Sequence, residues 1–117
     1  MRGVGEAPIF MVLLHYGKEF TMKESIFQKR FLDRIRAEFP GCYILKNDAS
    51  YIQGFPDWTV LYKDKWVVLE MKRSSEASRQ PNQEYYVKQL DRMSYSAFVC
   101  PENADEVLDE IRSIFSN

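Results

Sequence analysis

The stretch from Trp66 to Lys72 constrains the fold more than any other part of the chain. Its first four residues, Trp-Val-Val-Leu, are apolar as in a buried strand, yet Glu70, Met71 and Lys72 follow directly. Burying a carboxylate and an ammonium group at the end of a core strand costs free energy unless the groups are paired or bind a ligand. The chain is therefore expected to supply partners for Glu70 and Lys72.

The strand over residues 65–71 is predicted to form a hairpin with residues 58–62, because only two residues separate the two runs. Such a hairpin sets Asp57 opposite Glu70, with Cβ atoms about 4.5–5.5 Å apart. Lys72 lies on the same face as Glu70, since side chains alternate across a strand. Two carboxyl groups and one lysine are thus expected to meet at one end of the hairpin.

Two carboxylates that face each other destabilise a sheet, so Asp57 and Glu70 need a compensating cation or a shifted pKa. Mg²⁺ meets that need, because it binds through one or two carboxylates and takes water and substrate phosphate at its other positions. Lys72 is placed to polarise a water molecule or to hold a phosphate oxygen. The hairpin end therefore predicts metal-dependent chemistry at a phosphate group.

The rest of the chain reads as alternating helices and strands. The first predicted elements are a helix over residues 21–39, which starts at a Thr21–Glu24 capping box, and a strand over 42–45, followed by the two hairpin strands. A helix then begins at Pro81 and carries Tyr86, Leu90 and Met93 on one face. A strand over 96–100 and a helix after an Asn103–Glu106 capping box complete the chain. This order, α-β-β-β-α-β-α, predicts one mixed α/β domain over residues 21–117. Residues 1–20 are expected to form an N-terminal arm or an extra strand.

Composition narrows the class of protein. The 117 residues suit a single core, and the net charge of −1 conceals an acidic tail, since residues 102–117 carry five acidic residues and one basic residue. The two cysteines lie far apart, which disfavours a zinc or redox motif. The apolar run over residues 8–14 is too short to cross a bilayer and has no basic flank with a cleavage site. We expect a cytoplasmic protein with no membrane partner.

The pattern Pro56-Asp57, twelve residues, Glu70-Met71-Lys72 resembles the PD-(D/E)xK nuclease superfamily. Within it the chain is similar to the small VRR-NUC domains and to the phage and archaeal Holliday-junction-resolvase-like nucleases, although it has no Val-Arg-Arg tripeptide. The supporting stretches are Glu24–Gln28, Gly54–Asp57 and Gln80–Gln83. The resemblance covers roughly residues 21–115 and implies a restriction-endonuclease-like core with a mixed central sheet.

The resemblance also implies a role for each motif residue. Mg²⁺, or Mn²⁺ in its place, would be held by Asp57, Glu70 and the Met71 carbonyl with support from Glu24, while Lys72 would activate or orient the attacking water and Gln83 would position Lys72 or the scissile phosphate. DNA would be contacted by Lys23, Arg73 and Arg79 at its phosphates and by Tyr51 and Phe55 at an unpaired base.

Each assignment has an ordinary structural alternative. Asp57, Glu70 and Lys72 together suit a surface ion-pair cluster, and Glu24 suits a capping box that only starts a helix. Gln83 suits the first turn of a helix, and Tyr51 and Phe55 suit a lid over the core. The lone His15 is expected to be structural.

The motif predicts a Mg²⁺-dependent endodeoxyribonuclease of a bacterial or phage-infected cell. Structure-selective cutting of branched or junction DNA is the first hypothesis, because little of the chain remains for reading bases. A nicking or homing-type enzyme, a non-cleaving nucleic-acid-binding module of the same fold, and a small structural protein are the alternatives. The apolar segment Ile9–Leu14 is expected to act as an edge strand or exchanged arm in a homodimer.

Overall fold

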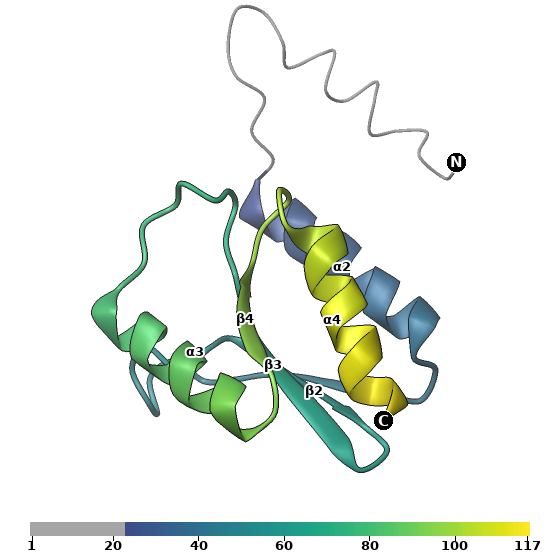
Figure 1. Ribbon diagram of the computed structural model, residues 1–117. Coiled ribbons are helices and arrows are strands. Elements are labelled where there is room, and N and C mark those ends of the chain that lie inside the picture. Colours follow the sequence, from purple (N-terminus) through teal and green to yellow (C-terminus); the bar gives the residue numbers. More distant parts are fainter. Residues whose placement is uncertain (1–22) are drawn as a thin grey trace, which may run out of the picture.

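The computed structural model describes residues 23–117, which form three helices and one four-stranded sheet in the order expected from the sequence (Figure 1). The elements are α2 (Glu24–Glu38), β1 (Tyr43–Lys46), β2 (Trp58–Tyr62), β3 (Lys65–Met71), α3 (Pro81–Met93), β4 (Ser96–Val99) and α4 (Ala104–Ser116). The predicted α-β-β-β-α-β-α order is confirmed.

The sheet has the strand order β1-β2-β3-β4, with the first two pairings antiparallel and β3 parallel to β4. The predicted mixed sheet is therefore confirmed. In the β2–β3 hairpin Tyr62 pairs with Lys65 and Trp58 pairs with Leu69, which is the register expected from a two-residue turn. Lys63 adopts φ 58° at this turn, a positive angle that the first position of a type II′ turn requires.

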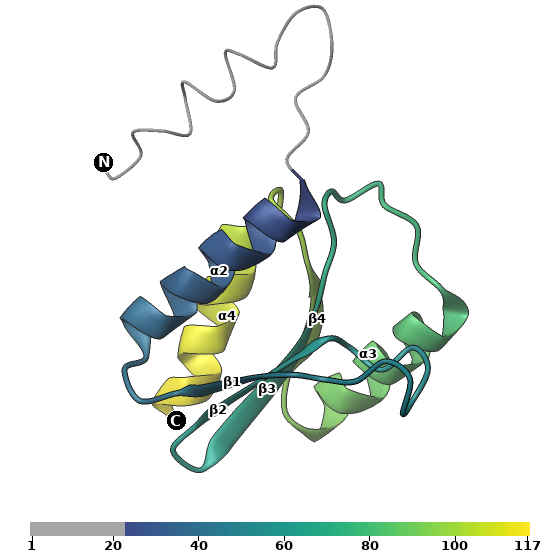
Figure 2. The same cartoon turned by 180° about the vertical axis from the view of Figure 1, so that it is seen from behind.

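The three described helices lie on the two faces of the sheet. α2 and α4 run side by side over one face, and α3 covers part of the other, as the front and back views agree (Figures 1 and 2). The hydrophobic core lies under α2 and α4 and takes alternate β3 residues, Val67, Leu69 and Met71. Glu70 and Lys72 alternate with these residues, so they belong to the face that α3 covers.

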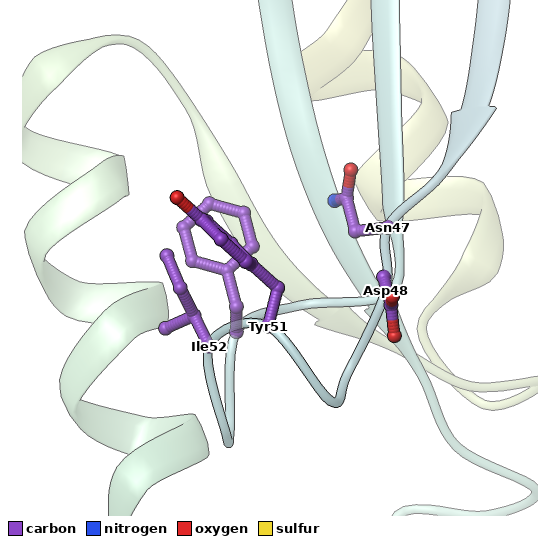
Figure 3. Close-up of a pocket in the computed structure, with 5 residues that line it drawn as sticks. Asn47, Asp48, Tyr51 and Ile52 are labelled. Atoms are coloured by element: carbon purple, nitrogen blue, oxygen red, sulfur yellow. The ribbon is translucent and has the colours of Figure 1, made fainter.

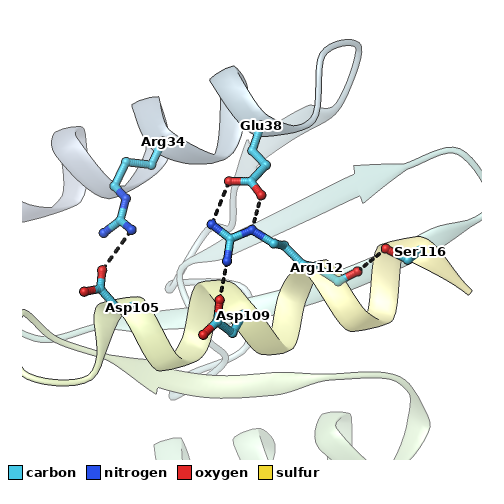
Figure 4. Close-up of polar contacts among 6 residues, drawn as sticks. All are labelled: Arg34, Glu38, Asp105, Asp109, Arg112 and Ser116. Atoms are coloured by element: carbon cyan, nitrogen blue, oxygen red, sulfur yellow. Dashed lines mark hydrogen bonds and ion pairs between the residues drawn. The ribbon is translucent and has the colours of Figure 1, made fainter. Parts of the chain in front are cut away.

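Polar contacts on the surface join α2 to α4 (Figure 4). Arg34 pairs with Asp105 at 2.9 Å, and Arg112 contacts both Glu38 and Asp109. Exposed pairs of this kind contribute about 0–1 kcal/mol each. The buried aromatic and aliphatic side chains between the two helices and the sheet therefore account for most of the stability of this layer.

Both predicted capping boxes are wrong. α2 begins at Glu24 with Lys23 as its N-cap, so Glu24 is the first helical residue and not the third that a capping box needs. Asn103 does occupy the N-cap of α4, but its side chain accepts from the Cys100 N–H and donates to the Phe98 carbonyl. It closes the turn between β4 and α4 instead of capping the helix.

The expected apolar face of α3 is only partly buried. Tyr86 and Leu90 are half-buried, whereas Met93 is 72% exposed. α3 does carry the capping box that its sequence did not suggest, between Gln80 and Gln83, with Pro81 at its first position as expected.

Some expectations lie outside the described residues. These are the arm or extra strand over residues 1–20, the dimer segment Ile9–Leu14, and His15. No helix that the structure describes is long and apolar enough to cross a membrane. Cys42 and Cys100 carry free thiols, of which that of Cys100 is buried.

Candidate active site

Two carboxyl groups meet where the hairpin strands reach the end opposite the turn. Glu70 is the second-last residue of β3, and Asp57 immediately precedes β2. The Asp57 N–H donates to Glu70 Oε1 at 3.2 Å. The Glu70 side chain is only 6% exposed, whereas that of Asp57 is 24% exposed. One carboxyl group is thus buried behind a second that solvent reaches.

Gln83 supplies the partner that Glu70 and Lys72 require. Lys72 Nζ donates to Gln83 Oε1 at 3.0 Å, and Gln83 Nε2 donates to Glu70 Oε2 at 3.2 Å. Lys72 Nζ lies 4.0 Å from Glu70 Oε2, so the amide bridges a loose ion pair. Gln83 Oε1 also accepts from the Gln80 N–H at 3.0 Å, which fixes the orientation of the amide. The first turn of α3 therefore holds the end of β3.

Burial and charge both act on Glu70. Burial is the larger cause, and together with the negative charge of Asp57 it raises the pKa of Glu70 to about 7. Lys72 and the Asp57 N–H act in the opposite direction but do not offset this rise. A cation between the two carboxyl groups would relieve the cost of ionising both, so the electrostatics of the site suit a bound metal ion.

The Met71 carbonyl is the backbone group available to such an ion. Val68 and Lys72 direct their N–H groups toward the β4 side, so the backbone groups of Met71, which alternate with them, point toward β2. The register continued beyond Trp58 sets Met71 opposite Pro56, which has no N–H to donate. Any other residue at this position could donate a sheet hydrogen bond to the Met71 carbonyl. Because proline cannot, that hydrogen bond is missing.

The donor set fits Mg²⁺ better than a metal that needs an all-protein cage. Within residues 23–117 no three His, Cys, Asp or Glu side chains gather closely enough to hold a metal ion. The available ligands are the carboxyl groups of Asp57 and Glu70 and the Met71 carbonyl. Mg²⁺ is commonly bound through one or two carboxylates, with water and phosphate oxygens completing its octahedron.

Glu24 lies at the margin of this cluster. It stands in the first turn of α2 and accepts from Gln28 Nε2 at 2.8 Å. Its charge is the smallest of the causes that raise the pKa of Glu70. None of the hydrogen bonds formed within residues 23–117 joins Glu24 to Asp57, Glu70 or Lys72, so the structure places it near the site without linking it to the motif.

Two residues of the site were missed by the sequence reasoning. Lys46 Nζ lies 3.6 Å from Asp57 Oδ2 and 4.8 Å from the centroid of the Trp58 ring. Asn47 donates through Nδ2 to the Pro56 carbonyl at 2.8 Å, and its backbone N–H donates to the Asp57 carbonyl at 2.7 Å. The β1–β2 register, which pairs Lys46 with Trp58, is the signal that would have found both.

The candidate DNA contacts are dispersed around the site. Lys23, Arg73 and Arg79 are exposed, and the Arg79 guanidinium lies 3.9 Å from the centroid of the Phe98 ring. Tyr51 is 85% exposed, while Phe55 is half-buried and packs on Tyr86 with ring centroids 5.6 Å apart. These side chains are available for contact, and within residues 23–117 they come from separate segments of the chain.

Comparison with solved structures identifies the architecture. A protein described as "VRR_NUC domain" superposes with a TM-score of 0.60 and 21% identity, covering 74% of this chain and 94% of its own. The chain has the VRR_NUC fold. A second structure, "VRR_NUC domain protein", gives a TM-score of 0.58 and 14% identity over 81% of this chain and 89% of that one. The resemblance to the VRR-NUC branch is thus confirmed at the level of fold.

Sequence comparison adds nothing to this assignment, since no family model and no curated protein matches the chain. The VRR_NUC fold explains why the motif residues lie where they do. Its hairpin carries Asp57 and Glu70, and its crossover from β3 through α3 to β4 brings Gln83 over them.

Proposed function

We propose that the chain is a metal-dependent DNA endonuclease that hydrolyses phosphodiester bonds. The observation that carries the proposal is the Lys72–Gln83–Glu70 hydrogen-bond chain beside Asp57, built at one end of a VRR_NUC fold. A structural ion pair would gain nothing from burying Glu70 next to a second carboxyl group. Binding of a cation and a phosphate group would explain why Glu70 is buried beside Asp57.

Asp57, Glu70 and the Met71 carbonyl would hold the metal ion, with Mg²⁺ as the natural ion and Mn²⁺ as a substitute. The ion would neutralise charge that develops on the phosphate and lower the pKa of a bound water. Lys72, oriented by Gln83, donates to the attacking water or to a phosphate oxygen. Glu24 contributes at longer range through its charge.

The proposed substrate is DNA with branched or unpaired structure. Base-specific recognition needs an element that reaches the grooves, and in the described part of the chain only two loops longer than four residues, 47–57 and 72–80, lie outside the helices and strands. Lys23, Arg73 and Arg79 would contact phosphates. A nicking or homing-type enzyme is the second candidate, since one active site of this kind cuts one DNA strand.

Cleavage of a panel of DNA substrates tests the proposal. Branched, flapped, single-stranded and linear duplex DNA are incubated with the protein in Mg²⁺ or Mn²⁺, with gel-shift binding measured in parallel. Asp57→Ala and Lys72→Ala are expected to abolish cleavage, whereas Asp64→Ala, at the exposed turn of the same hairpin, is expected to leave it unchanged. Full activity in Asp57→Ala and Lys72→Ala would contradict a nuclease site here. Binding without any product would identify a non-cleaving module.

A further inference from the structure

A small cavity borders the site on the loop that leads to Asp57. It has a volume of about 290 Å³ and is lined by Asn47, Asp48, Tyr51, Ile52 and Phe55. The side chains of Tyr51 and Ile52 lie on one side and those of Asn47 and Asp48 on the other (Figure 3). Ligand pockets usually begin at about 300 Å³, so the cavity suits one ring-sized group.

The cavity shares a wall with the proposed active site. Asn47 lines it and also donates to the Asp57 carbonyl through its backbone and to the Pro56 carbonyl through its side chain. Lys46, which pairs with Asp57, is the preceding residue. A DNA strand whose phosphate lies at Asp57 would therefore pass next to this cavity.

The loop is held in shape before any ligand binds. Gly54 adopts φ +89° and approaches α3 so closely that a Cβ there would lie 2.3 Å from the Cβ of Asn82. Asn82 Nδ2 donates to the Gln53 carbonyl at 3.4 Å, and Phe55 packs on Tyr86. A preformed loop loses little conformational entropy on binding.

The lining favours a base over a phosphate. The exposed Tyr51 ring offers a π-face to solvent, and the exposed Ile52 and half-buried Phe55 add apolar surface. Asp48 would repel a phosphate, and its pKa is lowered by hydrogen bonds from Ser50, so its carboxyl group is ionised near neutral pH. Aromatic stacking accepts any base, because every base has a π-face.

We propose that this cavity binds one unpaired nucleobase of the DNA strand at the active site, stacked on Tyr51. The inference rests on the proposed nuclease function and specifies its substrate: DNA with an unstacked nucleotide beside the scissile phosphate. A fully paired duplex keeps its bases stacked and leaves the cavity empty.

Binding measured without divalent metal tests the cavity separately from cleavage. The probes are a fluorescein-labelled duplex with one unpaired 2-aminopurine and the same duplex fully paired, titrated in EDTA. Wild-type protein is expected to quench the unpaired 2-aminopurine and to prefer that duplex. Tyr51→Ala is expected to abolish the quenching. Its affinity for the duplex with the unpaired base should fall at least about fivefold, which corresponds to the low end of the stacking energy of one base on an aromatic ring, and its affinity for the paired duplex should not change.

Matched variants separate stacking from general surface effects. Tyr51→Phe keeps the ring and is expected to bind like wild type, and Tyr43→Ala removes another exposed tyrosine, on β1, and is expected to have no effect. The proposal would be overturned if Tyr51→Ala lost the same affinity for both duplexes or lost none. It would also be overturned if the wild-type protein did not quench the unpaired 2-aminopurine. Base binding with no cleavage in Mg²⁺ or Mn²⁺ would instead overturn the nuclease function and leave the cavity assignment standing.

Discussion

At the scale of single residues, Glu70 makes the stability of the protein depend on pH. Its folded-state pKa of about 7 lies above the ordinary value of 4.5. The unfolded chain therefore ionises first as pH rises, and the folded state loses stability between about pH 4.5 and 7 and levels off above that.

We expect Glu70→Gln to remove this pH dependence from metal-free protein. The free energy of unfolding of the variant relative to wild type should rise by up to about 3 kcal/mol between pH 5 and pH 8, since Gln is neutral at both. Urea denaturation of both proteins in EDTA measures the difference. A difference that stays constant across this range would show that Glu70 titrates normally. Added Mg²⁺ should stabilise wild type more at pH 8 than at pH 5.

Lys46 offers a second prediction for a single side chain. Because it pairs with Asp57, we predict that it competes with a metal ion for that carboxyl group and that it contacts a phosphate once the ion has displaced it. Lys46→Met should bind Mg²⁺ more tightly and DNA more weakly, with the slope of log affinity against log salt reduced by about 1. Lys88→Met, on the exposed surface of α3, is the control. Unchanged metal affinity in Lys46→Met would argue against the competition.

At the scale of elements, the loop over residues 47–57 packs directly against α3, and this contact sets the position of α3 relative to the strand ends. Gly54 and Gly41 both have positive φ, but only Gly54 abuts another chain segment, whereas a Cβ at Gly41 meets open space. Gly54→Ala should therefore destabilise the protein by more than the roughly 1 kcal/mol expected of Gly41→Ala. Because Asn82 precedes Gln83, Gly54→Ala should also reduce cleavage. Thermal melts and cleavage rates of the two variants give the comparison, and equal effects would contradict it.

The elements also show what the sequence could predict. The hairpin and its register follow from local alternation and a two-residue turn, so the meeting of Asp57 with Glu70 was predictable. Lys46 and Asn47 were not, because their positions depend on how β1 pairs with β2. The predicted capping box at Asn103 is wrong because this side chain forms its hydrogen bonds with the backbone of the preceding turn. The spacing of residues in the sequence does not distinguish a helix cap from such a turn.

At the scale of the whole molecule, residues 23–117 contain a hydrophobic core built from α2, α4 and the sheet, to which α3 adds no fully buried residue. We propose that residues 21–117 form the nuclease domain. A chain that lacks residues 1–21 should unfold in one cooperative transition near the melting temperature of the full chain, as measured by calorimetry. An insoluble or unfolded product would show that the first residues belong to the fold.

Assembly is tested on the same pair of proteins. We propose that the full chain forms a homodimer through Ile9–Leu14, since symmetric cutting of two strands needs two sites. Light scattering should then give a dimer for the full chain and a monomer for the shortened one. A monomeric full chain at tens of micromolar would remove this proposal.

The position of the hairpin turn has a consequence for insertions. Asp57 and Glu70 lie at the end of the hairpin opposite Lys63 and Asp64, so adding one residue to each strand beside the turn lengthens the hairpin without changing which residues face each other. Adding a residue to only one strand shifts the pairing and turns one carboxyl group to the opposite face of the sheet. The distance between the two halves of the motif can therefore vary among sequences of this fold, provided that residues are gained or lost in pairs.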